Sequence, residues 1–404
     1  MHEPGIVFEE LATTRRTLRI AVATETYAPE LNGVAVTAAR FVEGLRALDH
    51  QIQLIRPRQG AADGGAPGEV LMRGVAIPRY PDLKLGLPAK RSLERLWSVR
   101  RPDVVHIVTE GPLGWSALRA AVKLKLPVVS DFRTNFHAYS THYGVGWLKK
   151  TILGYLRKFH NRTLCTLVPT AALRTQLSAL GFYRLRVVAR GVDTSMFNPT
   201  RRDPALRTQW GAGPKDLVLL YVGRIAAEKN LATLIEVHKR VPNAKMVLVG
   251  DGPLRSDLTA RYPALRFVGR KSGADLARHY ASGDIFLFPS LTETYGNVTL
   301  EAMASGLAVV AFDYAAAAEV MRGSGLLVPY EDNAAFVSQA AALATDSERV
   351  ALLARSARPA AEGYGWDAVV RELESVLIAA ADSGAAGRGA FLRKPKLQYA
   401  PGRA

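Results

Sequence analysis

Two glutamates lie eight residues apart, Glu293 and Glu301, in the stretch PSLTETYGNVTLEAMASG, with Gly296 and Asn297 between them. The flanking apolar runs DIFLFPS and LAVVAF are typical of buried strands, so a helix is expected to begin near Gly296 at a strand's carboxyl end. The free N–H groups and the dipole at a helix start favour an anion, and carboxylates accept hydrogen bonds from vicinal hydroxyls. The stretch therefore indicates a ligand that joins a sugar to an anionic group. The alternative is that both carboxylates only complement the helix dipole.

Two cations follow an earlier expected strand, DLVLLYVG (216–223). Arg224 offers a planar fork that matches phosphate oxygens, and Lys229, five residues on, adds a compact charge. The sequence GDGP at 250–253 ends the next expected strand and is, by itself, ordinary turn chemistry. These residues predict a phosphate-binding edge, with two solvated charges beside a helix start as the alternative.

Short apolar strands alternate with helical patterns along the whole chain, which predicts an α/β protein with parallel sheets covered by helices on both faces. Two such sets exceed what one doubly wound sheet usually holds, so we expect two Rossmann-like domains facing each other across a cleft. The expected strands are 17–24, 51–57, 103–108, 127–130, 165–169 and 184–190, then 216–223, 244–250, 265–269, 284–290, 307–312 and 325–329. The domains are placed at 17–195 (acceptor) and 210–365 (donor), around a turn-rich linker within 190–216, with a helix at 366–382 and a basic flexible tail at 383–404.

The charge distribution points to an anionic partner. The net charge is +17, and the segment 132–192 holds ten lysines and arginines and no acidic residue. Nucleic acid, a phosphorylated small molecule or an anionic lipid surface would each satisfy such a field. The single cysteine, Cys165, excludes an internal disulfide and a cysteine-built metal site. The amino-terminal residues do not resemble a secretory signal, and no apolar run is long enough to span a membrane, so a cytoplasmic protein is expected.

The chain resembles the family-4 retaining glycosyltransferases of the GT-B fold over residues 17 to about 380, through the motifs Glu293-x7-Glu301, Gly223-Arg224 with Lys229, GDGP and RGVDTSMFNP. It looks most like bacterial α-mannosyl- and glucosyltransferases that modify lipids or polysaccharide precursors. The resemblance implies that a nucleotide-diphosphate sugar, GDP- or UDP-linked, binds mainly to the second domain as a co-substrate, without a further cofactor. It also implies that Arg224 and Lys229 hold the diphosphate, that Glu301 binds the ribose and that Glu293 binds the transferred sugar.

The same resemblance places the amides of Gly296, Asn297 and Val298 towards the phosphates and the sugar, and Arg270 near the base, where a surface turn is the alternative. No Asp-x-Asp occurs in the chain, so we expect no metal site, because Arg224 and Lys229 can supply the positive charge at the departing phosphate. From overall resemblance we favour GDP-mannose as donor over a UDP-linked sugar. Neither the sugar nor the lipid or glycan acceptor follows from the residues themselves.

In the first domain, Gly33 stands at a helix start where the family commonly has a Gly-Gly pair, and it is expected to face the diphosphate unless it is a plain helix start. Glu110 lies at another strand's carboxyl end, where it would meet the acceptor or the sugar. Relatives often carry Phe-His-Thr after the next strand, whereas this chain has arginine, Arg133, in place of the histidine. We expect Arg133 to contact substrate directly, with His137 as the nearest group able to exchange a proton near neutral pH. The alternative is that Arg133 pairs with Asp131 or Glu110.

Two other functional classes compete with a glycosyltransferase. A nucleotide-sugar 2-epimerase on the same fold would need no acceptor and no basic surface. A nucleic-acid-binding protein would use the basic first domain, but the sequence carries no aromatic-basic RNA motif and no helix-turn-helix signature, so no nucleic-acid partner is expected.

The helical pattern at 146–162 bears on location. Leu148, Ile152, Tyr155 and Phe159 share one helical face, and Lys150 and Arg157 point away. We predict that this basic region docks on anionic membrane, which would make the protein peripheral on the inner face of the membrane. The alternative is a core-facing helix with a solvated basic face.

Overall fold

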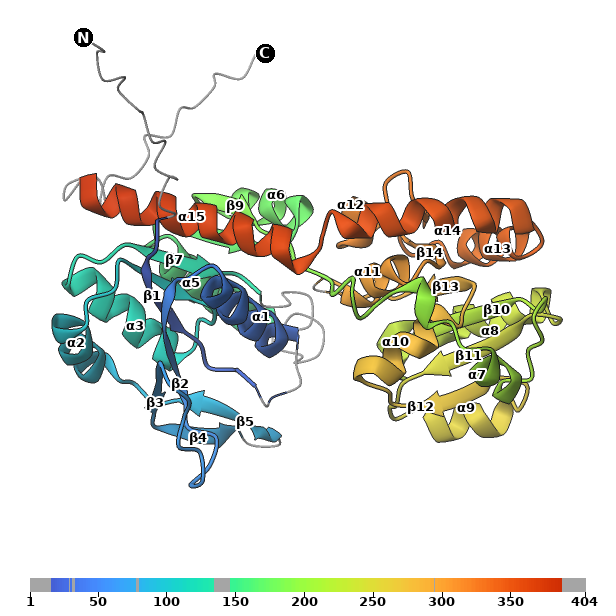
Figure 1. The fold of residues 1–404 in the computed structure, drawn as a ribbon, viewed down its shortest axis with the longest axis horizontal. Helices are drawn as coiled ribbons and strands as arrows, with labels where there is room; N and C mark the ends of the chain where they lie inside the picture. The colour runs from blue at the N-terminus through green and yellow to red at the C-terminus, as the bar shows by residue number, and fades with distance from the viewer. Residues whose placement is uncertain are drawn as a thin grey trace, which may run out of the picture.

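The computed structural model describes residues 16–28, 30, 33–77, 80–133, 146–293 and 295–386. It contains two parallel sheets, each in its own domain, with helices on both faces of each sheet (Figure 1). The α/β class and the two Rossmann-like domains expected from the sequence are confirmed, and each of the twelve expected strands is present.

The first sheet has the strand order β3-β2-β1-β6-β7-β8-β9, and its neighbouring strands run parallel. Its strands are nearly continuous apolar runs because both faces are covered by helices. Their bounds are β1 Arg19–Ala23, β2 Gln51–Pro57, β3 Glu69–Met72, β6 Val104–Ile107, β7 Val128–Asp131, β8 Cys165–Val168 and β9 Leu185–Val187. An antiparallel hairpin of β4 (Gly74–Ile77) and β5 (Tyr80–Gly86) extends from this domain; neither it nor β3 was expected from the sequence.

The second sheet has the order β12-β11-β10-β13-β14-β15, again parallel throughout. Its bounds are β10 Val218–Val222, β11 Lys245–Val249, β12 Arg266–Gly269, β13 Ile285–Phe288, β14 Ala308–Phe312 and β15 Leu326–Val328. Every residue of β10 and β14 is buried, so this sheet forms the centre of the second core.

The helices of the first domain are α1 Gly33–Ala47, α2 Lys90–Val99, α3 Pro112–Lys123, α5 Gly146–His160 and α6 Ala171–Ala179. Those that follow it in the chain are α7 Pro204–Gln209, α8 Leu231–Arg240, α9 Arg255–Arg261, α10 Gly273–Ala281, α11 Asn297–Ala304, α12 Ala317–Val320, α13 Asn333–Ala344, α14 Ser347–Glu362 and α15 Trp366–Ala386. Helix α7 lies inside the segment expected to be a linker. It is started by Asp203, whose carboxylate accepts from the Ala205 and Leu206 amides, and Leu206 is buried in the second core.

Helix α15 runs from the second domain back over the first (Figure 1). Its apolar residues belong to the same buried cluster as α1 and the first sheet, including Val370, Leu373 and Leu377. The approach to α1 is close, since a Cβ placed on Gly44 would lie 2.5 Å from a methyl carbon of Val370. The last helix is therefore an integral part of the first domain rather than an appendage.

Helix α5 differs from its predicted face. Leu156 and Phe159 are buried, whereas Tyr155, which was expected to share the apolar face, is 42% exposed. The Tyr155 ring lies 5.6 Å from that of Trp115, and its hydroxyl donates to the backbone carbonyl of Glu110. The inward face is thus turned by about one residue from the predicted one, while Lys150 stays exposed.

Candidate functional site

The two sheets share one topology, in which the first strand lies between the second and the fourth, and open α/β sheets bind ligands at this switch point, beyond the carboxyl ends of their strands. In the second domain the switch lies between β10 and β13. Lys229 follows β10 in a short 3-10 turn, and Glu293 follows β13. In the first domain the switch lies between β1 and β6, which lead to Gly33 and Glu110 respectively.

Lys229 and Glu293 form an ion pair although they are 64 residues apart in the chain. Ser290 completes the cluster, because its hydroxyl donates to Glu293 Oε1 at 2.9 Å and lies 3.3 Å from Lys229 Nζ. The Tyr314 hydroxyl donates to the Glu293 carbonyl at 3.3 Å and fixes the loop. Both side chains of the pair are 17% exposed, so each is held in place yet reachable by a ligand.

Arg224 lies beside this cluster but is not tied to it. Its side chain is 65% exposed and is 3.4 Å from Glu228, a weak contact that leaves the guanidinium able to move. Its backbone is fixed instead: the Tyr221 hydroxyl donates to the Arg224 carbonyl at 2.9 Å. Gly223 has to be glycine here, because a Cβ at that position would lie 2.5 Å from the Tyr221 hydroxyl.

Helix α11 begins next to Glu293 and points its amino end into the same region. Gly296 adopts a left-handed conformation with φ +85°, which lets the chain turn into the helix without a side-chain cap. Asn297 and Val298 form the first turn and are partly accessible. Within the described residues the amides of Asn297 and Val298 have no hydrogen-bond acceptor, so they are available to an anionic group.

Glu301 lies on α11 and accepts a hydrogen bond of 2.9 Å from the hydroxyl of Tyr280, which is fully buried on α10. Burial raises the pKa of Glu301 to about 7, and the Tyr280 hydrogen bond opposes this in part. Arg270, by contrast, is exposed at the end of β12, and no contact links it to Glu301 or to the Lys229 cluster in the part of the chain described.

At the first domain's switch point, Gly33 is exposed at the start of α1 and lies against Arg190, since a Cβ on Gly33 would be 2.8 Å from Arg190 Nη1. Glu110 is half-buried, and its carboxylate lies 3.2 Å from His160 Nε2. The other ring nitrogen of His160 lies 3.0 Å from the Ser130 hydroxyl. Glu110 is therefore the outer end of a buried polar chain.

Arg133 is 3% exposed and pairs with Asp131, Nε to Oδ2 at 3.4 Å, as the alternative interpretation of the sequence had it. Asp131 also lies 3.4 Å from His106 Nε2. Although burial opposes ionisation of Asp131, the charges of Arg133 and His106 lower its pKa below the ordinary value. His137 lies outside the described residues.

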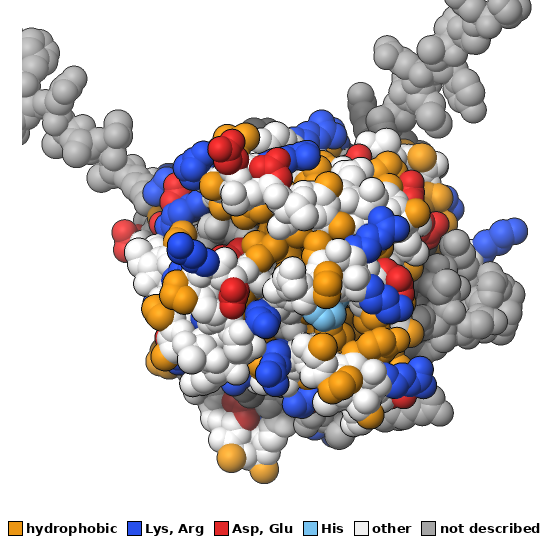
Figure 2. All heavy atoms as spheres, turned by 90° about the vertical axis from the view of Figure 1, so that its right-hand side faces the viewer, with side chains coloured by type: hydrophobic (Ala, Val, Ile, Leu, Met, Phe, Trp, Pro, Cys, Tyr) orange, Lys and Arg blue, Asp and Glu red, His pale blue; other side chains and the backbone are white. Residues whose placement is uncertain are grey.

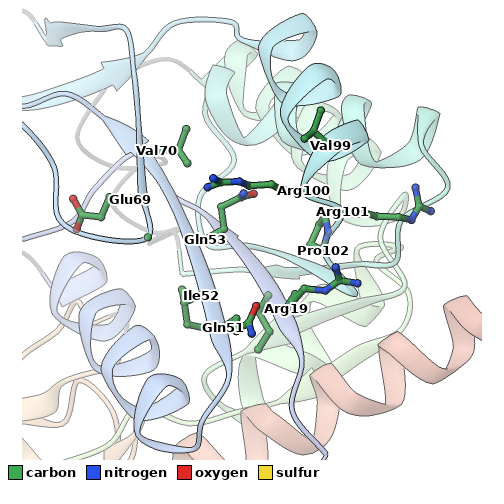
Figure 3. Close-up of a pocket in the computed structure, with 12 residues that line it drawn as sticks. Arg19, Gln51, Ile52, Gln53, Glu69, Val70, Val99, Arg100, Arg101 and Pro102 are labelled. Atoms are coloured by element: carbon green, nitrogen blue, oxygen red, sulfur yellow. The ribbon is translucent and has the colours of Figure 1, made fainter.

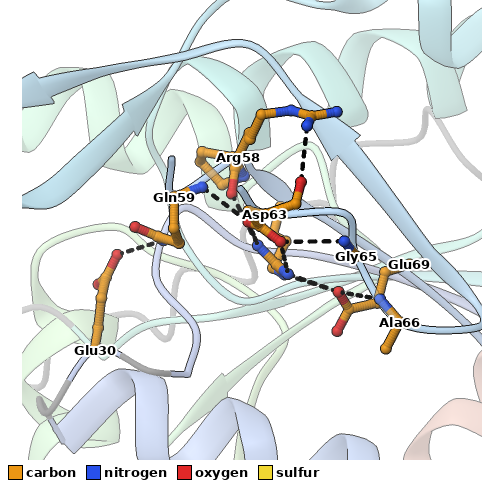
Figure 4. A network of polar contacts seen from close by, with 9 residues as sticks. Glu30, Arg58, Gln59, Asp63, Gly65, Ala66 and Glu69 are labelled. Carbon is orange, nitrogen blue, oxygen red and sulfur yellow. Dashed lines mark hydrogen bonds and ion pairs between the residues drawn. The ribbon is translucent and has the colours of Figure 1, made fainter. Parts of the chain in front are cut away.

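A polar network that joins Arg56 to Asp63 and Glu69 holds the loop after β2, and Figure 4 shows Asp63, Glu69 and their neighbours in that loop. The Arg56 guanidinium donates to Asp63 Oδ2 at 2.6 Å and to Glu69 Oε2 at 2.7 Å, and the pairing with Arg56 holds the pKa of Asp63 far below its usual range. Gln59 in the same loop donates to Glu30 at 2.9 Å. Because Glu30 precedes α1, the network braces the amino end of that helix.

A cavity of about 470 Å³ lies at the opposite edge of the first sheet (Figure 3). Its polar lining includes Arg19, Gln53 and Arg100, and it is formed by the amino ends of β1 and β2. Substrates of parallel α/β sheets bind at the carboxyl edge, so we do not assign this cavity to the candidate site.

In the described ranges, no set of three or more His, Cys, Asp or Glu side chains is placed to hold a metal ion. Nor is any helix among them long and apolar enough to cross a bilayer. On the face of the second domain shown in Figure 2, basic side chains are interspersed with acidic and uncharged ones.

Two family models match the chain: residues 31–196 match Glycosyltransferase Family 4, and residues 216–346 match Glycosyl transferases group 1. A GDP-mannose-dependent alpha-mannosyltransferase of Mycobacterium tuberculosis is 33% identical over 367 residues, which cover 88% of this chain and 95% of that protein. The chain belongs to the family 4 glycosyltransferases. An alpha-monoglucosyldiacylglycerol synthase of Acholeplasma laidlawii is 27% identical over 321 residues, 72% of this glycosyltransferase and 80% of the synthase.

Solved structures confirm the GT-B fold. HepE of Anabaena, in complex with UDP, superposes with a TM-score of 0.72 at 17% identity, over 89% of this chain and all of the other. The family match makes this protein an enzyme and gives no support to the epimerase or nucleic-acid-binding alternatives.

Several residues at the site were not singled out from the sequence. Ser290 lies three residues before Glu293, a spacing that would have drawn attention only once Lys229 was known to be adjacent. No local sequence pattern marks Tyr280 or Tyr314 as part of a site. Arg190 was read as part of the linker, although it is 7% exposed between the two domains.

Proposed function

We propose that this glycosyltransferase moves a hexose, with mannose from GDP-mannose as the favoured case, to a lipid or glycan acceptor with retention of configuration. The observation that carries the proposal is the Lys229–Glu293 pair at the switch point of the second sheet, beside the start of α11. The mannosyltransferase at 33% identity supports GDP-mannose, and the glucosyldiacylglycerol synthase supports a lipid acceptor.

In this proposal the donor's diphosphate lies between Lys229, Arg224 and the first-turn amides of α11. As the bond from the sugar to the phosphate breaks, negative charge grows on the leaving phosphate, and these groups stabilise it without a metal ion. The Lys229 charge is already fixed beside Glu293 and Ser290, so little reorganisation is needed when the donor binds.

Glu293 and Glu301 accept hydrogen bonds from hydroxyl groups on either side of the diphosphate. Glu293 accepts from hydroxyls of the transferred sugar, which exchange for part of its contact with Lys229. Glu301 accepts from the ribose, and its hydrogen bond from Tyr280 orients the carboxylate for that purpose. Arg270 lies at the exposed end of β12, consistent with a contact to the base.

The acceptor enters from the first domain, where Gly33 and Glu110 occupy the facing switch point. We propose peripheral docking through the exposed basic side chains of α5, Lys150, Arg157 and Lys158. Each basic residue near an anionic lipid surface contributes about 1 kcal/mol to membrane binding.

The test is incubation of the full chain with labelled GDP-mannose, UDP-glucose and UDP-N-acetylglucosamine, with diacylglycerol in mixed micelles as acceptor. Nucleotide release that depends on acceptor, together with label in the lipid, is the expected result with GDP-mannose. Isomerised sugar without acceptor consumption, or no release with any donor, would reject the proposal. A thermal-shift series with GDP and UDP then ranks the bases, because a bound ligand raises the unfolding temperature.

A further inference from the structure

Two buried arginines lie together where the first domain meets the second. Arg133 is 3% exposed and Arg190 is 7% exposed. They are neighbours in space, since Arg133 Nη2 lies 3.4 Å from the carbonyl oxygen of Val188, two residues before Arg190. Burial and the charge of Arg133 together lower the pKa of Arg190 to about 10. Clustered cations of this kind are costly to bury unless anions compensate them.

The described residues supply only part of that compensation. Asp131 lies 3.4 Å from Arg133 Nε and is shared with His106. No carboxylate in the described ranges lies within ion-pair distance of Arg190. Among the described residues, Asp131 is therefore the one carboxylate within ion-pair distance of either guanidinium.

Their hydrogen bonding is incomplete as well. Arg133 donates from Nη2 to the Val188 carbonyl at a long 3.4 Å, and its Nε reaches Asp131 only at 3.4 Å. Its Nη1 has no hydrogen-bond partner within the part of the chain that is described. The same is true of Arg190 Nε. Buried donors normally find partners, so unfilled donors on two adjacent guanidinium groups indicate an acceptor that a ligand brings.

The surroundings of Arg190 place these donors at the inter-domain surface. Its guanidinium lies against Gly33 at the amino end of α1 and 5.9 Å from the ring centre of Tyr295. The Tyr295 hydroxyl donates to the Arg190 carbonyl at 3.1 Å, which joins the two domains at this point. Tyr295 lies two residues beyond Glu293, whose charge also acts on Arg190.

We propose that Arg133 and Arg190 form a subsite for an oxyanion of a substrate: a carboxylate, a sulfonate, or a phosphate mono- or diester. The inference rests on the proposed function, in which Glu293 faces the transferred sugar. The diphosphate has its own partners in Lys229, Arg224 and α11, so the additional anion lies beside the sugar. It is carried either by the donor sugar or by the head group of the acceptor.

An oxyanion subsite explains why position 133 is arginine rather than histidine. A guanidinium offers a fixed fork of donors to both oxygens of an oxyanion and stays charged at every physiological pH. A histidine at that position offers one donor towards the ligand and is largely neutral at pH 7.5. Arg133 and Arg190 are therefore specificity-determining residues for an acidic substrate.

The experiment compares matched neutral and acidic substrates with the full chain. The donor arm sets UDP-glucose against UDP-glucuronate, with diacylglycerol as acceptor. The acceptor arm sets diacylglycerol against phosphatidylinositol, with GDP-mannose as donor. Variants are Arg133→Gln, Arg190→Gln, Arg133→His and the charge-retaining Arg133→Lys, with Arg174→Gln as control at an exposed arginine of α6.

In one arm the acidic substrate is expected to have the higher kcat/KM. The glutamine and histidine variants should lower kcat/KM for the acidic member about ten- to hundredfold more than for the neutral member, as expected for lost charge-assisted hydrogen bonds. Arg133→Lys should keep part of the preference, and the Arg174 variant all of it. The arm that responds identifies whether sugar or acceptor carries the anion. An acidic-to-neutral ratio that is the same in all variants, in both arms, overturns the proposal.

A binding measurement separates this proposal from the proposed function. Low-millimolar sodium sulfate, against sodium chloride at equal ionic strength, should raise the unfolding temperature of the parent saturably, and not that of the glutamine variants. If no nucleotide sugar is turned over but this difference persists, the proposed function fails and the oxyanion subsite stands. Equal sulfate effects in parent and variants reject the subsite.

Discussion

The Lys229–Glu293 pair offers a test in which catalysis and folding respond differently. Lys229→Ala removes the cation that we propose lies closest to the leaving phosphate, while Glu293 keeps its hydrogen bond from Ser290. Loss of a preorganised charge contact of this kind typically costs about 2.7–4 kcal/mol of transition-state stabilisation, which is about 100- to 1000-fold in kcat. Glu293→Ala should lose a similar factor through sugar recognition.

The effect on stability should be much smaller. Both side chains are 17% exposed, so the pair is neither fully buried nor free in solvent. Breaking it should cost about 1–2 kcal/mol, between the values for exposed and buried pairs. For domains of this size that corresponds to about 2–8 °C in unfolding temperature.

The assay is nucleotide release at saturating donor, with the unfolding temperature recorded on the same samples. Lys239→Ala is the matched control, because Lys239 makes a 2.7 Å ion pair with Glu236 on the exposed face of α8. That variant should keep parental turnover. If a folded Lys229→Ala or Glu293→Ala variant turns over at close to the parental rate, the site assignment is wrong.

Three further predictions follow from other parts of the molecule. The raised pKa of Glu301, about 7 against an ordinary 4.5, means that the folded state holds a proton which the unfolded chain releases, so stability should fall as pH rises from about 4.5 to 7. After discounting for solvent at the partly open site, the free energy of unfolding should fall by about 1–2 kcal/mol over this range. Denaturant unfolding at pH 5 and pH 7.5 measures this fall for the parent and for Glu301→Gln. A fall of the same size in both proteins would contradict the prediction. Gly250→Ala should cost about 3 kcal/mol or more in denaturant unfolding, because its Cβ would overlap the Gly223 carbonyl at a φ of +147°, whereas Gly60→Ala in open space should be neutral. Charge reversal on α5, by Lys150→Glu or Lys158→Glu, should weaken salt-sensitive binding to anionic liposomes in flotation about tenfold or more per residue. Lys215→Glu in the second domain serves as the control. Equal binding of the parent to neutral and anionic liposomes would reject electrostatic docking.

Much of the fold was predictable because each core strand is a short apolar run that differs in period from the helices around it. The exceptions have local causes. The run IPRYP at 77–81 contains two prolines, which interrupt the alternation that marks a strand, so β4 and β5 were missed. In α5 the apolar spacing fits two adjacent faces, and only packing against Trp115 shows that Tyr155 lies outside.

The candidate site was predictable residue by residue but not as an arrangement. Glu293 and Lys229 each follow a strand, yet their contact depends on β10 and β13 being neighbours, which no local pattern encodes. Arg190, in contrast, was not recognised as a site residue at all. Its neighbours in sequence are polar and turn-rich, so no local pattern indicated that both domains bury it.

The return of α15 to the first domain makes that domain discontinuous in the chain. Its last core residues, such as Leu373 and Leu377, are made only after the whole second domain. During synthesis, the apolar surface of α1 that α15 later covers therefore stays exposed until the second domain has been made, and the second domain can fold as a unit in that time. The two crossings between domains also lie side by side, since Val192 pairs with Gly365 and Gly191 lies against Trp366. The core of the first domain can therefore be completed only after α15 has been synthesised, so both domains reach their folded state late in synthesis.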